Sequence, residues 1–468
     1  MSKLVGSIAE AVQFAGVKDG MTISFHHHLR SGDFVLNMVM DEIAKMGIKD
    51  LTINASSIHP GHAPLAKHVK SGVVTCVETN YMSIEVGQAV SEGYMKKPMI
   101  FRTHGGRPSS LAEGKSHIDV AFIAAPTSDP MGNFTGKIGK SACGSLGYAF
   151  EDAYYADKVV VITDNLVPYP LTDFSVPENY VDYVVEVDAI GDPQGIVAST
   201  TKMTKDPVSL RIAELAAKAI DASGLLKDGF SFQTGAGGAS LACAAYVRDI
   251  MKERGIKGSY ALGGITGYIV DMYREGLFEA IQDVQCFDLK AVESLRDDPG
   301  HFEISSTQYA SPTAKSSAAS SLDAVVLGAT QIDTEFNVNV HTDSRGYIIG
   351  GSGGHTDVAE EAKLTVIVAP VSRARMPVVV DKVLTVSTPG KDVDVLVTQY
   401  GIAVNPARQD LIERFTQAKL PVKTMQELKE IADKLNGVPA EIKVNKNKIV
   451  AEVLDRLDQP LDVIYAVE

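Results

Sequence analysis

Cysteine is scarce in this sequence, and no long apolar run occurs in it. The four cysteines, Cys76, Cys143, Cys243 and Cys286, stand far apart with no CxxC pair, so they indicate neither a zinc site nor a disulfide framework. No stretch reaches the roughly 18–20 uninterrupted apolar residues that a membrane span requires. Glu10 also stands where a secretory segment would carry its apolar core. We therefore expect a reduced, cytoplasmic protein with no membrane partner.

Basic residues are outnumbered as well, with 44 Lys and Arg against 58 Asp and Glu and a formal net charge of −14. An acidic chain without a long basic run is poorly suited to nucleic acid, so no such partner is expected. Hydrophobic residues make up 45% of the chain, enough apolar material to offset chain entropy, which excludes disorder. The motifs GxSxG, HExxH and the P-loop are absent, which excludes those kinds of chemistry.

What the sequence does contain is an internal repeat. VKDGMTISF in the first half matches LKDGFSFQT in the second, and MGIKD matches RGIKG. Further along, DVAFIAAP matches DAVVLGAT and GSLG matches GSGG, in the same order and always about 204–209 residues apart. This repetition predicts two homologous domains, residues 1–205 and residues 206–468, the second of which carries a C-terminal extension.

Each half alternates short β-branched runs with helical patterns. LTINA, DVAFIAA and KVVVIT in the first half and LTVIVAP in the second are typical strands, and residues 34–46 show apolar side chains at helical spacing. Continuous apolar strands separated by helices indicate mainly parallel sheets covered on both faces. The predicted fold class is α/β with two similar open domains, and ligands of such folds bind in the loops after the strands.

The second half contains two glycine-rich loops: QTGAGGAS, directly after its first predicted strand, and IGGSGGH, before a predicted helix. Glycine lets a loop turn its backbone N–H groups toward one point, where they can hold a phosphate or the oxyanion of an attacked thioester. A plain tight turn explains the first loop equally well, and the second loop strengthens the case for an anion or acyl site. The acyl-site interpretation assigns catalytic backbone groups to Gly235, Gly237, Gly238, Gly351, Gly353 and Gly354, with His355 next to them as a substrate-binding residue.

At the matching place in the first half, a strand ends in His26, His27, His28 and then Arg30. Three histidines and an arginine at one strand end attract anions, so we predict a substrate site here. Metal ligation is a rival interpretation, because imidazole is a common ligand. Adjacent strand residues point to opposite faces, however, so three consecutive histidines do not easily share one ion, and no metal site is expected.

A third polar cluster, FRTHGGRPSS, contains Arg102, His104 and Arg107 after an apolar stretch. Arginine suits bidentate carboxylate recognition, so this cluster is also a predicted substrate site, although a solvated loop explains it as well. Asn337 and Asn339 lie two residues apart and therefore on one face of a strand. We expect them either to orient a substrate carbonyl or to cap a turn.

These segments together resemble a known family. The two-half plan, DVAFIAAPTSDPMGNFTG, the GSGGHTD loop and VSTPGKDVDVLVTQYGIAVNP are similar to the CoA-transferase superfamily. SFHHHLRSGDFVLNMVMDEIAKMGIKDLTI, CGSLGYAF, DGFSFQTGAGGASLA and LGGITGYIVD are similar to its citrate lyase alpha chain family. The resemblance runs through essentially the whole chain.

The resemblance implies an acyl-exchange enzyme. Members of this family move the thiol of an acyl carrier protein from acetyl to citrate, which gives citryl-thioester and acetate, and acetyl-CoA can replace the carrier. The implied partners are the beta and gamma chains of a citrate lyase complex, of which gamma bears the CoA-derived prosthetic group. No metal and no covalently bound cofactor are implied. The glycine loops would hold the thioester, and the His and Arg clusters would bind citrate.

One departure from the superfamily concerns its covalent members, which carry a nucleophilic Glu where this sequence has Gly267. A glycine cannot form a glutamyl-thioester, so the resemblance implies direct attack by the substrate through a ternary complex and a mixed anhydride. The sequence leaves two alternatives open: a transferase or hydrolase for another acid such as citramalate, and a non-catalytic ligand sensor. Docking of an acidic carrier would require basic residues, for which Lys96, Lys97, Lys137 and Lys140 are candidates.

Overall fold

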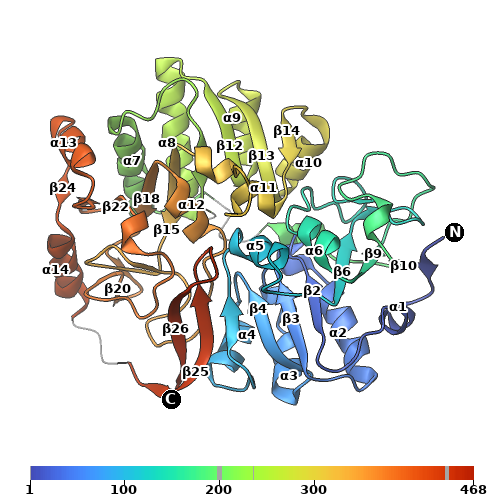
Figure 1. Ribbon diagram of the computed structural model, residues 1–468. Helices are drawn as coiled ribbons and strands as arrows, with labels where there is room; N and C mark the ends of the chain where they lie inside the picture. The colour runs from blue at the N-terminus through green and yellow to red at the C-terminus, as the bar shows by residue number, and fades with distance from the viewer. Residues whose placement is uncertain (1, 198–202, 236, 438–441) are drawn as a thin grey trace.

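Two large sheets organise the computed structural model, which describes residues 2–197, 203–235, 237–437 and 442–468 (Figure 1). Within those residues the first sheet has ten strands in the order β1-β10-β9-β6-β2-β3-β4-β5-β25-β26. The second sheet has nine in the order β14-β13-β12-β11-β15-β18-β22-β23-β24. Pairing is parallel throughout both sheets except for β22–β23 and β25–β26, so the predicted α/β class with mainly parallel sheets is confirmed.

The strands have the following bounds. In the first sheet they are β1 Leu4–Val5, β2 Thr22–Phe25, β3 Leu51–Ala55, β4 Val74–Thr79, β5 Met99–Phe101, β6 Val120–Ala125, β9 Lys158–Thr163, β10 Tyr183–Glu186, β25 Val444–Leu454 and β26 Pro460–Val467. In the second they are β11 Phe232–Thr234, β12 Gly258–Ile265, β13 Phe278–Cys286, β14 His301–Glu303, β15 Ala324–Gly328, β18 Leu364–Val368, β22 Val395–Thr398, β23 Gly401–Val404 and β24 Val422–Lys423.

Helices cover both faces of each sheet. They are α1 Ile8–Phe14, α2 Val35–Lys45, α3 Leu65–Ser71, α4 Ile84–Ser91, α5 Gly106–Ala112, α6 Ala149–Tyr155, α7 Pro207–Ala222, α8 Gly238–Arg254, α9 Gly267–Arg274, α10 Leu289–Asp297, α11 Ser306–Ala310, α12 His355–Glu361, α13 Gln409–Gln417 and α14 Met425–Asn436. The central strands β6 and β18 are buried at every residue because helices lie on both sides.

The internal repeat of the sequence appears as a repeated topology. The strand order β10-β9-β6-β2-β3-β4-β5 of the first sheet is reproduced by β22-β18-β15-β11-β12-β13-β14 of the second. The matching turns also use the same contacts. The Lys49 N–H donates to Asp19 Oδ1 at 2.8 Å, and in the second half the Lys257 N–H donates to Asp228 Oδ1 at 3.0 Å. The two halves are therefore duplicated units, as predicted.

The C-terminal extension crosses between these units. Strand β25 pairs in parallel with β5, so β25 and β26 extend the first sheet although they end the chain (Figure 1). The domain limits of 1–205 and 206–468 stay a prediction, and the pairing shows that the last two strands share the sheet of the first domain. Within the described residues, no helix is both long and apolar enough to cross a membrane.

Candidate active site

The loops after the parallel strands of both sheets meet between the two halves. Helices α5, α6, α11 and α12 lie at this junction near the middle of the molecule (Figure 1). The loops after β2, β3, β4 and β5 come from the first half, and the loops after β13 and β14 and before α12 come from the second. Carboxyl edges of parallel sheets are where α/β folds bind ligands, so this junction is the candidate site.

The three consecutive histidines lie buried at this junction, directly after β2. His27 Nδ1 lies 2.7 Å from Ser56 Oγ, and its Nε2 lies 3.0 Å from Gln285 Oε1 in the second half. His26 and His28 face each other, with their Nδ1 atoms 2.8 Å apart. Since one of these two nitrogens must donate and the other accept, the pair shares one hydrogen between two neutral rings.

Burial keeps these imidazoles uncharged. It lowers the pKa of His26 to about 4 and holds the pKa values of His27 and His28 well below the usual range. Burial and, to a lesser extent, the charge of Arg107 lower the pKa of His104 to about 3. At neutral pH the cluster therefore offers neutral donors and acceptors rather than positive charge.

Arg30 supplies the positive charge. It is 8% exposed, and its guanidinium carbon lies 4.6 Å from the centre of the Phe287 ring in the second half. Burial lowers its pKa to about 10, so it stays charged at neutral pH. Among the described residues no carboxylate pairs with it, and its Nε is buried without an acceptor. A buried cation without a counter-ion is a binding site for an anion.

Several aromatic and imidazole rings near Arg30 were not among the predicted site residues. His59 stacks on Tyr81 with ring centres 5.4 Å apart, and Tyr148 lies 4.8 Å from the His27 ring. His59 follows β3, so the rule that ligands bind after strands could have found it. Gln285 carried no such signal, because only the packing of the two halves brings it to His27. Tyr148 belongs to the same half as His27, but it stands at the start of α6 rather than directly after a strand.

The loop after β5 brings His104 to the same cluster. The His104 ring lies 4.4 Å from the Tyr148 ring and 5.8 Å from the His27 ring, and its Nδ1 is buried without a partner in the described structure. The His104 N–H donates to Gly353 O at 2.9 Å, and the Gly353 N–H donates to Asn80 O at 3.1 Å. The predicted GSGG loop thus packs against the strand ends of the first half.

The two glycine loops differ in how their backbone groups are used. The Gly353 N–H is engaged by Asn80, whereas the N–H groups of Gly351 and Gly354 have no acceptor among the described residues. Gly237 caps α8 without a side-chain bond, and Gly238 begins that helix. Ser240 Oγ in the first turn of α8 is buried without a partner. Residue 236, between these glycines, lies outside the described residues.

The two remaining predicted arginines are paired with carboxylates inside the protein. Arg102 forms ion pairs with Glu78 and, at 2.8 Å, with Asp458. Arg107 Nη2 lies 2.6 Å from Asp152 Oδ1, and its Nε donates to Asn54 Oδ1 at 2.7 Å.

The polar residues of the second half that were predicted to bind substrate also have internal partners. Asn337 donates to Asp333 at 3.2 Å and accepts the Gly390 N–H. Asn339 Nδ2 donates to Thr342 at 3.0 Å. His355 contacts Thr388 Oγ1 and Gly328 O, both at 2.9 Å.

Gly267 and three of the candidate lysines contact groups that are not part of the histidine cluster. Gly267 begins α9, and a Cβ placed there would come within 2.9 Å of the Lys290 side chain. Of the candidate lysines, Lys137 pairs with Asp173 at 2.7 Å, and Lys140 donates to Asp188 O at 2.6 Å. Lys97 lies 4.0 Å from Asp50.

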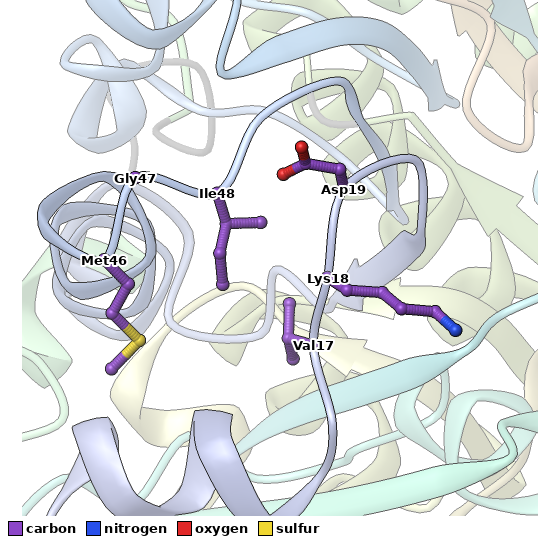
Figure 2. Close-up of a pocket in the computed structure, with 6 residues that line it drawn as sticks. All are labelled: Val17, Lys18, Asp19, Met46, Gly47 and Ile48. Atoms are coloured by element: carbon purple, nitrogen blue, oxygen red, sulfur yellow. The ribbon is translucent and has the colours of Figure 1, made fainter.

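The amino edge of the first sheet holds two further features. A shallow hollow lies between the turns before β2 and β3, with Lys18 pointing away from Met46 and Ile48 (Figure 2). The side chains of His117, Asp119 and Asp157, which precede β6 and β9, lie close enough together to share an ion. Both features are at the edge opposite the carboxyl edge that bears the histidines, so they belong to no common site with them.

A family model described as "Citrate lyase, alpha subunit (CitF)" matches residues 1–467. The chain belongs to the citrate lyase alpha subunit family. The citrate lyase alpha chain of Haemophilus influenzae is 47% identical over 466 residues, which cover 100% of this chain and 93% of that one. The family resemblance of the sequence, and with it the expectation of an enzyme subunit, is confirmed.

Two solved structures show how far this family likeness extends. The alpha subunit of citrate lyase from Streptococcus mutans, in complex with citrate, has a TM-score of 0.98 at 52% identity, over 100% of this chain and 92% of that one. A Pseudomonas malonate decarboxylase hetero-tetramer in complex with malonate has a TM-score of 0.68 at 15% identity, over 95% of each chain. The second likeness shows a shared fold alone.

Proposed function

We propose that this chain transfers a CoA or acyl-carrier thiol from acetyl to citrate, as the acyl-exchange subunit of a citrate lyase. The observation that carries the proposal is the buried Arg30 guanidinium, which has no carboxylate partner in the described structure and lies among neutral imidazoles. Citrate is a trianion rich in hydrogen-bond acceptors and carries one hydroxyl. A fixed cation flanked by neutral donors and acceptors matches that chemistry. The relative from Streptococcus mutans was solved with citrate, which supports the assignment.

The thioester side of the reaction is assigned to the glycine loops of the second half. The uncapped start of α8 and the unengaged N–H groups of Gly351 and Gly354 present donors to a developing oxyanion. Each such donor typically contributes roughly 2.7–4 kcal/mol to the transition state. Holding both acyl partners between the two halves contributes on the order of 7–11 kcal/mol through ordering.

The exchange requires no covalent enzyme intermediate. A citrate carboxylate oxygen attacks the acetyl thioester carbon, the C–S bond breaks, and the thiolate leaves with the electron pair. The resulting citryl–acetyl anhydride is attacked by the thiolate at its citryl carbonyl, and acetate leaves. Thiols of pKa about 8.5 leave without a strong general acid, so neutral histidines suffice as hydrogen-bond partners. Gly267 supports this path, because it offers no nucleophile.

The proposal has a direct chemical test. The purified chain is incubated with isotopically labelled citrate and either acetyl-CoA or an acetylated acyl carrier. The masses of the products and of the protein are then measured by mass spectrometry. We expect labelled citryl-thioester, free acetate and an unmodified chain. Absence of citryl-thioester from both donors would overturn the transferase assignment. A chain bearing covalent CoA would overturn the ternary-complex mechanism.

We also propose the assembly and the thiol donor. The citrate lyase beta and gamma chains are the proposed partners, with the CoA-derived group of gamma, or acetyl-CoA, as substrate rather than as a cofactor of this chain. Transfer to citramalate in place of citrate is the nearest competing activity, and labelled citramalate in the same assay separates the two.

A further inference from the structure

Two buried carboxylates, Asp357 and Glu151, form hydrogen bonds between the halves of the chain, one from each half, and each set of bonds is called a clamp below. Asp357, the third residue of α12, accepts the Thr103 hydroxyl at 2.6 Å and the Gly105 N–H at 3.0 Å. Glu151, the third residue of α6, accepts the Ser306 hydroxyl at 2.7 Å and the Thr307 N–H at 2.8 Å. Each helix therefore binds the segment that follows one strand, β5 or β14, of the other half.

The two clamps are related by the internal duplication. Helices α6 and α12 occupy matching places in the repeat, as do β5 and β14. Asp357 is fully buried and Glu151 is 2% exposed, and no basic side chain in the described structure forms a salt bridge with either. Among the residues that the structure describes, only hydroxyl and backbone N–H groups donate hydrogen bonds to these two buried carboxylates. The contacts therefore fix the position of the donor segments but do not neutralise the carboxylate charges.

The clamps differ in what the gripped segment carries. Asp357 holds the residues on both sides of His104, whose ring faces Tyr148 and His27 in the candidate site. The segment held by Glu151 begins helix α11 and places no imidazole in the cluster. One contact therefore holds an imidazole of the site, whereas its counterpart holds none and serves as the matched comparison.

Further contacts leave the His104 loop little freedom once Asp357 is in place. Asn80 Nδ2 donates to the carbonyls of Arg102 and Thr103 at 2.8 and 2.7 Å. A Cβ on Gly105 would lie 2.8 Å from Asp357 Oδ1, so the loop passes directly against that carboxylate. Loss of the Asp357 bonds would leave the bond from the His104 N–H to Gly353 O as a remaining link between this segment and the second half.

We infer that Asp357 is a positioning residue, which sets the His104 imidazole in the citrate site from the opposite half of the chain. The inference rests on the proposed function for the role of His104 in catalysis, but the placement of the ring can be measured without turnover. Displacement of a positioned group by about 1 Å can lower the rate about 100-fold.

The kinetic test compares Asp357→Asn with Glu151→Gln. Both variants remove one clamp charge, and we expect both to lower the melting temperature. Only Asp357→Asn should lower kcat/KM for citrate about 100-fold, whereas Glu151→Gln should stay within about threefold of the wild type. Thr103→Ser, which keeps the hydroxyl, should retain activity that Thr103→Val loses. Equal losses in Asp357→Asn and Glu151→Gln, or full activity of Thr103→Val, would overturn the inference.

A spectroscopic test separates this inference from the proposed function. With the histidine rings 13C-labelled at Cε1, His104→Gln identifies the His104 signal among the 11 histidines. Asp357→Asn should move that signal and Glu151→Gln should leave it in place. An unmoved signal in Asp357→Asn would overturn the positioning role. A wild-type chain that forms no citryl-thioester would instead overturn the proposed function, while the spectrum still decides the placement of His104.

Discussion

The guanidinium carbon of Arg30 lies 4.6 Å from the centre of the Phe287 ring, although the two residues belong to different halves of the chain. Arg30 itself has a left-handed backbone, with φ 52°. An aromatic face attracts a cation without using its N–H donors. Phe287 of the second half thus holds the Arg30 guanidinium in place and leaves the N–H donors of that guanidinium to an anionic ligand.

Replacement of Arg30 tests this arrangement. Arg30→Ala removes charge-assisted hydrogen bonds worth about 2 kcal/mol, so the KM for citrate should rise about 30-fold. The KM for acetyl-CoA should change less than about threefold, because no thioester contact is assigned to Arg30. Steady-state kinetics with each substrate varied in turn provide the measurement. An equal rise in both constants would point to a folding role.

Gly353 tests the contact between the glycine loop and His104. Its φ is +51°, and a Cβ would lie 3.2 Å from His104 Nε2. Gly353→Ala should lose roughly 1–2 kcal/mol of stability through backbone strain and should also impair turnover by displacing His104. Gly20→Ala is the control, because Gly20 has φ +83° with open space at its Cβ position. That variant should show the strain in chemical denaturation but normal turnover.

Replacement of Arg107 tests whether this residue binds citrate or only forms an internal ion pair with Asp152. It lies 2.6 Å from Asp152 Oδ1, and burial raises the pKa of that carboxyl. Arg107→Met would leave a buried charge without its partner and should lower the unfolding free energy by about 3–5 kcal/mol. Fluorescence-detected denaturation measures this loss. The citrate KM of the folded fraction should be unchanged, and a selective rise in that constant would restore Arg107 as a citrate ligand.

The buried histidines predict loss of stability in acid. Burial lowers the pKa of His104 to about 3, below the unfolded value of 6.5, so the unfolded chain binds more protons as pH falls below 6.5. From pH 6.5 to 5 this one residue should reduce stability by about 2 kcal/mol. The difference in unfolding free energy between wild type and His104→Gln, measured at pH 7 and pH 5, should shift by that amount in favour of the variant. A pH-independent difference would contradict the neutral, buried state of His104.

The fold was largely predictable from local patterns. The runs LTINA, DVAFIAA and LTVIVAP became β3, β6 and β18, because short, largely apolar runs with β-branched residues are typical of parallel strands that helices cover on both faces. The repeat correctly indicated duplicated units, since matching segments adopt matching turns. The place of residues 444–467 was not predictable: β25 pairs with β5, and that pairing leaves no periodic trace in either segment.

The candidate site was predictable only in part. His26, His27, His28, Arg30 and His104 do converge, because each lies just after a parallel strand of the same sheet. Arg102 and Arg107 follow the same rule, yet they meet Glu78, Asp458 and Asp152. A sequence shows that an arginine follows a strand, but its carboxylate partners come from distant segments.

The sequence by itself determined the α/β class, the duplication and the strand ends from which ligand groups project, because these follow from local periodicity and motif spacing. Its motifs also resemble those of the family to which the chain belongs. Only the tertiary structure decided which groups remain unpaired for a ligand. That outcome depends on contacts between halves, such as Arg30 with Phe287 and Asp357 with the loop of His104. Charge is neutralised by whichever side chain lies near in space, and proximity across the two sheets exists only once both have folded and packed.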